Sequence, residues 1–423
     1  MNNHVSWMIR ERNPRLLWIG RMHAFLADQL HEISLIWLVW EITGSSTQTA
    51  LVMFIGRIPF WALSWMAGVY VDRLPRRFIV VITSSISGTL ALVMFLLFAL
   101  DRLTYFLLAA IALFIATART VEWPALTAQL PELVPPAYIQ SMNTVADNTK
   151  RVARLIGPLT ISVLQRLFPV ASFYLWVSAA YYAMACCAAG LRPLSVAEPF
   201  PRKSMVKELS EGFQILYTSR SLLLIVLCFT LYSPAYAAGY WVLLPRLTGD
   251  ELGGGVGAYS LAVAAFGTGG LICNLGFSVL RIQDKACATL VGILIVSTGF
   301  GLLSIAPNLL SVWIICMVAA MGLPLMDICL PSLIHELVPS EKMGRVVALW
   351  RYFAEIGMAA GFLMSGPIAD WLGPRVTLLF SSLYAVPLTV VFLWFINVHP
   401  GSRSHGVIGK EKDEGSERCQ AHH

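Results

Sequence analysis

The residues of this chain best able to do chemistry are ionisable side chains inside long apolar segments. The first such segment holds Asp28, His31 and Glu32 near its middle. A charge at that depth is costly, so it is retained where it faces a wet cavity or a partner. A carboxylate there can take up a proton, which relieves the cost. We therefore expect Asp28, Glu32, His31 and Glu122 to carry proton coupling, although His31 fits a hydrogen-bonded structural role equally well.

Basic side chains recur at the same depth in other apolar segments. The helical period places Lys150, Arg151 and Arg154 on one face, and their surplus charge requires water, a carboxylate or a bound anion. We expect Arg151 and Arg154 to contact an anionic group of the substrate, with bidentate geometry where that group is a carboxylate. The substrate-binding wall is expected to comprise Arg21, Arg57, Arg119, Asp147, Lys150, Arg151, Arg154, Arg351 and Glu355.

Two structural interpretations of these charges stay open at the level of sequence. Arg21, Arg119 and Asp327 could lie near the ends of their segments and extend towards the membrane surface. Two pairs with a spacing of four residues could instead neutralise each other without any functional role: Asp147 with Arg151, and Arg351 with Glu355.

The segments that hold these charges are too apolar for a soluble enzyme. Of the 423 residues, 57% are hydrophobic and 13% are charged, whereas soluble domains carry about 25% charged residues. Apolar runs long enough to cross roughly 30 Å of hydrocarbon recur along the chain. They predict an all-α membrane protein with about twelve transmembrane helices. The expected spans are 15–42, 48–71, 78–99, 104–129, 141–166, 169–190, 221–246, 256–280, 287–305, 310–335, 344–369 and 376–398.

A short repeat divides the chain into two halves. The residues Glu-Leu-Val-Pro occur at Glu132–Pro135 and again at Glu336–Pro339, and the same offset relates Gly157 to Gly361. Because each copy ends one apolar run and precedes another, we expect two pseudo-symmetric six-helix bundles with a binding site between them. The expected organisation is an N-terminal bundle over 1–191, a cytoplasmic linker over 192–220, a C-terminal bundle over 221–400 and a polar cytoplasmic tail over 401–423.

Lys and Arg are concentrated in alternate loops. They occur within 10–15, 73–77, 192–207 and 281–285 and in the C-terminal tail, whereas 43–47 and 306–309 contain none. Positively charged loops stay on the cytoplasmic side, so both termini are expected there. The net charge of +6 follows from this bias, and no nucleic-acid partner is expected.

The loop at residues 68–77 carries a family signature and reads GVYVDRLPRR. It resembles the Gly-x-x-x-Asp-Arg-x-Gly-Arg-Arg motif of the major facilitator superfamily, with Pro75 where glycine is usual. The resemblance implies a conformational latch between neighbouring helix ends, formed by Gly68, Asp72, Arg73 and Arg77. The alternative is a loop that only anchors the orientation of the chain.

Further stretches look like the same superfamily. Gly157 and Pro158 resemble the Gly-Pro motif of its antiporter-type members, without the usual flanking glycines, and we expect them to serve the conformational change. Residues 366–373 also look like the family. Residues 124–135 are similar to a bacterial branch that includes macrolide-efflux and enterobactin-exporter-like proteins. The resemblance extends to about residue 400 and implies a multi-pass protein of the bacterial inner membrane.

These features favour a secondary active transporter, namely a proton-coupled exporter of a small polar or anionic organic solute such as a siderophore- or carboxylate-like metabolite. It would work by alternating access. Multidrug efflux and uptake of a siderophore-like solute are alternatives, and a non-transporting receptor or assembly factor is a remote one. The sequence has no GxxxxGK[ST] loop, and its histidines lack metal-ligand spacing. We expect no enzymatic activity, cofactor or metal, and a monomer whose partners are its solute, protons and the bilayer.

The predicted latch can be tested at Asp72. Replacing Asp72 with Asn should shift the population between inward- and outward-open states without abolishing binding, because it removes the charge that would bond a neighbouring helix end. Double electron–electron resonance between spin labels at the cytoplasmic ends of the two bundles measures this shift. An unchanged distance distribution would leave the loop with an anchoring role only.

Overall fold

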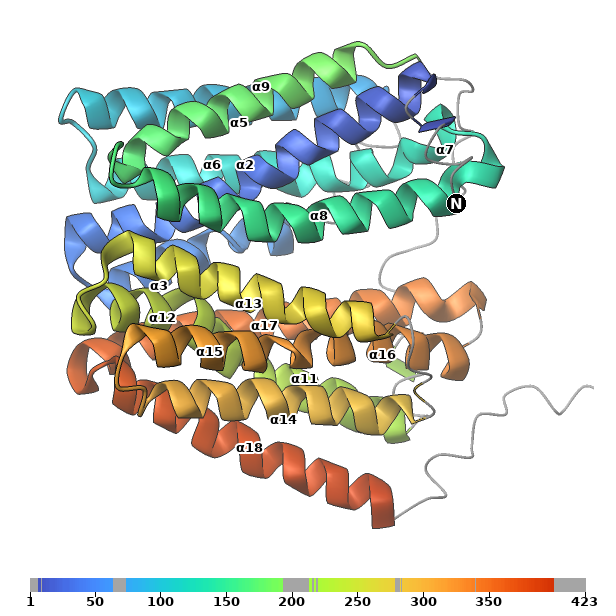
Figure 1. The fold of residues 1–423 in the computed structure, drawn as a ribbon. Coiled ribbons are helices and arrows are strands. Elements are labelled where there is room, and N and C mark those ends of the chain that lie inside the picture. The colour runs from blue at the N-terminus through green and yellow to red at the C-terminus, as the bar shows by residue number, and fades with distance from the viewer. Residues whose placement is uncertain are drawn as a thin grey trace, which may run out of the picture.

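The computed structural model describes residues 7–8, 10–63, 74–192, 213–214, 217, 220–277, 282, 284–338 and 340–398. Within these residues the chain is helical and contains no strand (Figure 1). The first half contributes α2 (Arg12–Thr43), α3 (Ser46–Ile55), α5 (Arg76–Ala99), α6 (Tyr105–Ala128), α7 (Leu130–Leu133), α8 (Pro136–Leu164), η1 (Val170–Ser172) and α9 (Phe173–Ala189).

The second half begins with α11 (Arg220–Ala237), which continues through two π-helical turns, η2 (Ala238–Leu243) and η3 (Leu247–Glu251), separated by α12 (Leu244–Arg246). The remaining helices are α13 (Gly255–Phe277), α14 (Lys285–Leu303), α15 (Leu309–Ala320), α16 (Gly322–Leu337), α17 (Ser340–Leu372) and α18 (Pro374–Val398). Each expected span thus coincides with helix over most of its described residues.

Nine helical stretches of the described chain are long and apolar enough to cross a membrane. Neither α2 nor α8 is among them, because the ionisable residues that the sequence singled out make both helices too polar. The second expected span is described only as far as residue 63. The fold class is therefore confirmed, whereas the count of about twelve spans stays a prediction.

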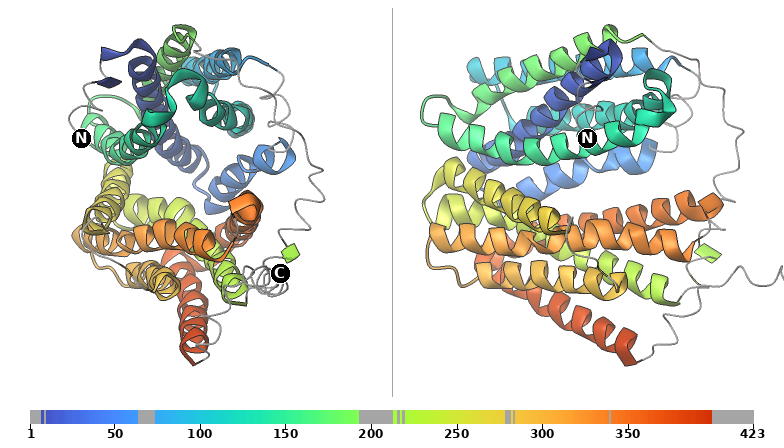
Figure 2. Two further views of the ribbon diagram at one scale, coloured as in Figure 1. Left: turned by 90° about the vertical axis from the view of Figure 1, so that its right-hand side faces the viewer. Right: turned by 45° about the vertical axis from the view of Figure 1, so that its right-hand side comes forward.

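The helices lie in two groups that face each other across a central seam (Figure 1). In one group α9 packs against α2 and α5, and α8 packs against α2; in the other α14 packs against α15, α16 and α18, and α11 against α17. The largest contacts between the groups are those of α8 with α13 and of α3 with α17. The start of α2 and the end of α18 lie at the same end of the molecule, which we call the terminal end (Figure 2).

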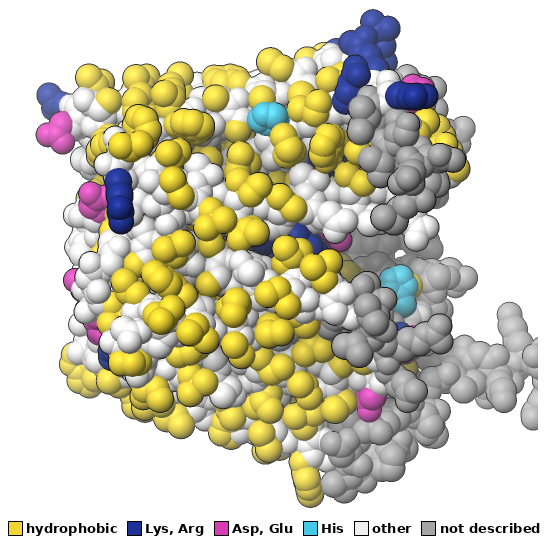
Figure 3. Space-filling view, in the orientation of Figure 1, with side chains coloured by type: hydrophobic (Ala, Val, Ile, Leu, Met, Phe, Trp, Pro, Cys, Tyr) yellow, Lys and Arg dark blue, Asp and Glu magenta, His cyan; other side chains and the backbone are white. Residues whose placement is uncertain are grey.

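The outer surface is apolar. Figure 3 shows hydrophobic side chains over most of one face, with Lys and Arg side chains visible in the seam between the two groups. Large residues such as Phe106, Ile305 and Val163 are exposed on the described helices. This surface suits lipid, since the hydrocarbon of a bilayer takes the place of water around such a protein.

The repeat seen in the sequence corresponds to two similar helix contacts. A Cβ atom added at Gly157 of α8 would lie 2.7 Å from Cβ of Gln29 on α2. A Cβ atom added at Gly361 of α17 would lie 2.5 Å from the carbonyl oxygen of Pro234 on α11. In both halves glycine thus lets one helix approach the first helix of its group at a distance that no other residue permits.

The close contact at Gly361 gives a stability prediction. Gly361→Ala should lower the unfolding free energy by about 1–3 kcal/mol, because the new methyl group meets backbone atoms that cannot rotate away. Gly276→Ala is the matched control, since nothing lies within 4 Å of its added Cβ. Thermal unfolding of the purified variants in detergent compares the two. Equal midpoints for both variants would contradict the packing account.

Candidate functional site

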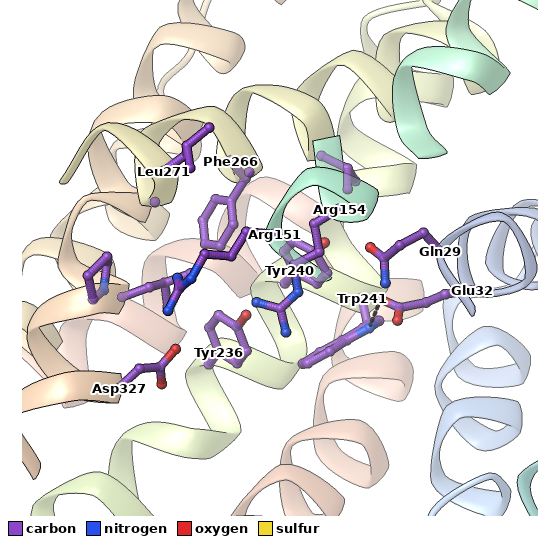
Figure 4. A pocket seen from close by; sticks show the side chains of 15 residues that line it. Gln29, Glu32, Arg151, Arg154, Tyr236, Tyr240, Trp241, Phe266, Leu271 and Asp327 are labelled. Atoms are coloured by element: carbon purple, nitrogen blue, oxygen red, sulfur yellow. Dashed lines mark hydrogen bonds between the residues drawn. The ribbon is translucent and has the colours of Figure 1, made fainter. Parts of the chain in front are cut away.

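A cavity between the two groups of helices is lined by both. Its inner part, of about 100 Å³, is lined by side chains of α2, α8, α11, η2, α13 and α16 (Figure 4). A middle part of about 430 Å³ shares Gln29 with the inner part, and an outer part of about 760 Å³ shares Arg119 and Lys150 with the middle one. The inner part therefore admits the end of a solute, and the wider parts admit its body.

One arginine is shared by two carboxylates in the first group of helices. Arg119 of α6 pairs with Asp28 of α2 through Nη2, and its Nη1 lies 2.8 Å from Oε2 of Glu122. Tyr181 donates a hydrogen bond of 2.8 Å to the other oxygen of Asp28, and Ser84 donates one of 2.8 Å to Glu122. We call these five residues the Arg119 cluster.

The Arg119 cluster is short of positive charge. Two ionised carboxylates around one guanidinium leave a net negative charge away from bulk water, which is unfavourable unless a proton joins them. The Glu122 side chain is fully buried, whereas 31% of the Asp28 side chain is exposed and lines the middle part of the cavity. Of the two carboxylates, Asp28 is therefore the one that the cavity reaches.

A second set of contacts crosses the seam between the two groups. Trp241 of η2 donates a hydrogen bond of 2.8 Å to Glu32 of α2. Arg57, which follows α3, lies 3.4 Å from both carboxylate oxygens of Glu355 on α17. The guanidinium of Arg57 also lies 5.4 Å from the Trp241 ring centroid, a cation–π contact. Four elements thus meet where the middle and inner parts of the cavity join.

The basic residues of α8 face the cavity in order along the helix. Lys150 lies 5.3 Å above the ring of Trp123 in the outer part, and Asp147 lines the same part. Arg151 and Arg154 line the inner part, where both side chains point inward (Figure 4). No ion pair between Asp147 and Arg151 occurs in the described chain, so neutralisation within the helix does not account for this charge.

On the facing helix α17, the alternative of an ion pair between Arg351 and Glu355 is likewise absent from the described residues. Glu355 has Arg57 as its ion-pair partner instead. Both Arg351 and Glu355 line the middle part of the cavity. The sequence thus predicted the location of the two charges but not the partner of Glu355, which comes from the other group of helices.

An aromatic wall faces the basic residues, and reasoning from sequence missed it. Tyr236, Tyr240, Trp241 and Phe266 line the inner part, with ring centroids of neighbouring pairs 4.9–6.3 Å apart. The π-helical geometry of η2 places Tyr240 and Trp241 together on the cavity side. Such turns are frequent at functional sites. The signal in the sequence was the spacing of Tyr232, Tyr236 and Tyr240 by four residues in an apolar segment.

Other expected site residues have structural partners. Arg21 is buried and donates a hydrogen bond of 2.6 Å to the carbonyl of Leu126 near the end of α6, while also lining the outer part of the cavity. His31 lies edge-on to Tyr174 at 5.6 Å, and its buried Nδ1 has no hydrogen-bond partner among the described residues.

Of the expected latch, only part is described. Arg77 donates a hydrogen bond to the carbonyl of Ala189 at the end of α9, within its own group of helices. Gly157 and Pro158 are buried in α8. Gly68, Asp72 and Arg73 lie outside the described residues, so their bridging role stays a prediction.

At the end opposite the terminal end, Asp370 joins the two groups of helices. This residue of α17 accepts hydrogen bonds from the backbone N–H groups of Ser46 (2.8 Å) and Thr47 (2.9 Å) and from the hydroxyl of Ser45 (2.7 Å). These donors form the N-terminus of α3, whose free N–H groups and positive dipole end favour a carboxylate. Asp370 thus caps a helix of the other group.

Arg246 of α12 supports the same contact. Its Nη1 donates hydrogen bonds to Asp370 (3.0 Å), to the carbonyl of Ala369 (2.7 Å) and to the hydroxyl of Ser46 (3.0 Å). The guanidinium also lies 5.5 Å from the Trp40 ring centroid. We call Asp370, Arg246 and the three capped residues Ser45, Ser46 and Thr47 the Asp370 closure. The hydrogen bonds across the seam are charge-assisted, because each has the Asp370 carboxylate or the Arg246 guanidinium as one partner.

Two groups of membrane helices around a central polar cavity, closed at one end, are the architecture of a membrane transporter. The sequence model of the transmembrane secretion effector family matches residues 8–406. The chain belongs to this family of the major facilitator superfamily, which confirms the resemblance seen in the sequence.

Relatives whose names state a function support the same class of protein, a membrane transporter. The chain is 22% identical to macrolide efflux protein A of Streptococcus pyogenes over 406 residues, which covers 92% of this chain and 97% of that protein. It is 25% identical to the multidrug efflux pump Tap of Mycolicibacterium fortuitum over 406 residues, which covers 90% and 95%. A solved bacterial homologue of the iron transporter ferroportin, in an inward-facing state, shares the fold with a TM-score of 0.69 at 16% identity, covering 90% and 98%.

The Asp370 closure gives a prediction about conformational balance. Asp370→Asn should favour states in which this end is open, because the amide loses the charge that faces both Arg246 and the N-terminus of α3. Asp101→Asn in the loop after α5 is the control, since Asp101 is exposed and is not part of the Asp370 closure. Accessibility of a cysteine placed at Thr47 to a membrane-impermeant maleimide should rise in the first variant alone. Equal labelling rates in both variants would contradict the role of Asp370.

Proposed function

We propose that this transporter is a proton-coupled exporter of a small organic solute that carries an anionic group, working by alternating access. The observation that carries the proposal is the Arg119 cluster, in which one guanidinium serves two carboxylates beside the cavity. Acidic side chains paired with a cation at membrane depth are typical of the proton pathways of transporters.

The coupling would follow from competition for Arg119. A proton on Asp28 weakens the pairing of Asp28 with Arg119 and leaves the guanidinium to Glu122 alone. Loss of the proton restores the full pair and draws α2 and α6 together. Because α2 also carries Glu32, whose partner Trp241 belongs to the other group of helices, a shift of α2 is felt across the seam.

The solute would bind between α8 and the aromatic wall. Arg151 and Arg154 offer guanidinium groups without an ion-pair partner closer than 4 Å in the described chain, which suits an anionic group. Tyr236, Tyr240 and Phe266 offer flat apolar surface to the rest of the molecule. Together they favour a solute with one charged end and an apolar or aromatic body.

We propose export as the direction of transport. The cavity widens from its inner part towards α6 and the start of α8, and the Asp370 closure shuts the opposite end. With both termini cytoplasmic in a bacterial inner membrane, as the distribution of Lys and Arg predicts, the solute would load from the cytoplasm. The named relatives are efflux proteins, which agrees with this direction. We propose that a single chain suffices.

Multidrug efflux is the second candidate. The aromatic wall supports it, because flat rings accept many apolar molecules, and so do the names of the relatives. The two candidates differ in charge selectivity: an anion exporter would use Arg151 and Arg154, whereas a pump for lipophilic cations would use the carboxylates of the cavity.

Flux measurements test the proposal. Purified protein in proteoliposomes should move carboxyfluorescein against its gradient when a pH gradient is imposed. Asp28→Asn and Glu32→Gln should each reduce this uphill flux by at least about tenfold, since one lost charge-assisted interaction is worth about 1.5–3 kcal/mol. Downhill exchange should persist. Glu336→Gln is the control, because Glu336 lies on an exposed part of α16, where it pairs with Lys285 of α14.

The other outcomes separate the candidates. Unchanged uphill flux in both Asp28→Asn and Glu32→Gln would remove these residues from coupling. Transport of ethidium that carboxyfluorescein does not inhibit would reverse the assignment in favour of multidrug efflux. No gradient-driven flux of either dye by the wild-type protein would contradict the proposed function itself.

A further inference from the structure

One carboxylate in the inner part of the cavity has no hydrogen bond or ion pair among the described residues. Two carboxylates line this part, Glu32 and Asp327. Glu32 accepts a hydrogen bond from Trp241. Asp327, on α16, is open to the cavity and has no hydrogen bond or ion pair within 4 Å in the described part of the chain.

Asp327 faces the basic residues of the other group of helices without touching them. Figure 4 shows its carboxylate and the guanidinium groups of Arg151 and Arg154 pointing into the same space, with the ring of Tyr236 next to Asp327 and Arg154. Opposite charges that share a cavity normally close into a contact, since a direct pair is stronger than a separated one. Here the two walls hold them apart, which leaves room for a molecule between them.

The aromatic wall forms the side of this space. The Tyr236 ring is stacked on Tyr240 at 5.8 Å and lies edge-on to Trp241 at 5.2 Å, so its position is fixed by its neighbours. A molecule between Arg154 and Asp327 would therefore meet a positive group at one end, a negative group at the other, and a ring alongside. A simple anion would leave Asp327 facing it, which is unfavourable.

We propose that the inner part binds an amphoteric solute, whose carboxylate or similar anionic group contacts Arg151 and Arg154 and whose protonated amine contacts Asp327. The proposal rests on the proposed export function and names the substrate class of the same cavity. The volume of about 100 Å³ requires the two charged groups to be close together at one end of the solute, as in an amino acid. The apolar body of the solute would extend along Tyr236 and Tyr240 into the wider parts.

Three matched probes test this proposal with the full-length protein. L-tryptophan carries both charges, N-acetyl-L-tryptophan carries only the carboxylate, and tryptamine carries only the amine. The dependence of the unfolding midpoint on ligand concentration gives the dissociation constant of each. The wild-type protein should bind L-tryptophan at least about tenfold more tightly than either analogue, because each analogue lacks one charge-assisted contact.

Two variants should change this preference in opposite ways. Asp327→Asn should weaken L-tryptophan binding to the level of N-acetyl-L-tryptophan, while binding of N-acetyl-L-tryptophan is retained or strengthened. Arg154→Gln should weaken L-tryptophan binding to the level of tryptamine. Glu336→Gln lies on the same helix as Asp327 but outside the cavity, and it should leave all three dissociation constants unchanged.

Several results would overturn the proposal. The wild-type protein could bind N-acetyl-L-tryptophan as tightly as L-tryptophan, or it could bind none of the three probes. In the third case, Asp327→Asn would lose the same binding affinity for all three probes. If Asp327→Asn keeps the binding preference but loses pH-driven flux, Asp327 carries a proton instead of an amine. Failure of the proposed export function would give a different outcome. The wild-type protein would bind L-tryptophan selectively, yet an imposed pH gradient would move neither L-tryptophan nor the dyes.

Discussion

The cost of holding charge away from bulk water governs this structure. Every carboxylate that the described helices bury within the membrane-spanning part must find a cation, a hydrogen-bond donor or a proton. One guanidinium, that of Arg119, is shared by the two carboxylates Asp28 and Glu122, and the proposed proton coupling starts from this shortage of positive charge. The pairing of Arg57 with Glu355 and of Trp241 with Glu32 satisfies others only while the two groups of helices are together. The compensation of these charges therefore depends on the conformation of the molecule.

The fold was largely predictable because its signals are additive along the chain. Apolar length, Lys and Arg in alternate loops, and the repeated Glu-Leu-Val-Pro each depend on local sequence alone. The ionisable wall of the cavity was also predictable, since charged residues in apolar helices are few and costly. Asp28, Arg119, Arg151 and Arg154 line the cavity that the structure shows.

The partners of these residues were not predictable. Spacing by four residues left pairing of Glu355 with Arg351 open as an alternative, but the structure pairs Glu355 with Arg57 from the other group of helices. Helical spacing describes one helix, whereas pairing depends on how two groups of helices meet. The aromatic wall was missed for a related reason: tyrosine and tryptophan in an apolar segment are ordinary membrane residues until the π-helical turn of η2 brings them to one side.

The capping of α3 by Asp370 has a consequence for observation. The amide hydrogens of Ser46 and Thr47 are protected by a carboxylate from the other half of the chain, so their protection lasts only as long as the two halves touch at that end. The rate at which these amide hydrogens exchange with deuterated water would therefore report how often this end of the protein opens. The measurement needs no label on the chain. Hydrogen exchange in the first turn of this short helix thus measures the opening step of the proposed transport cycle.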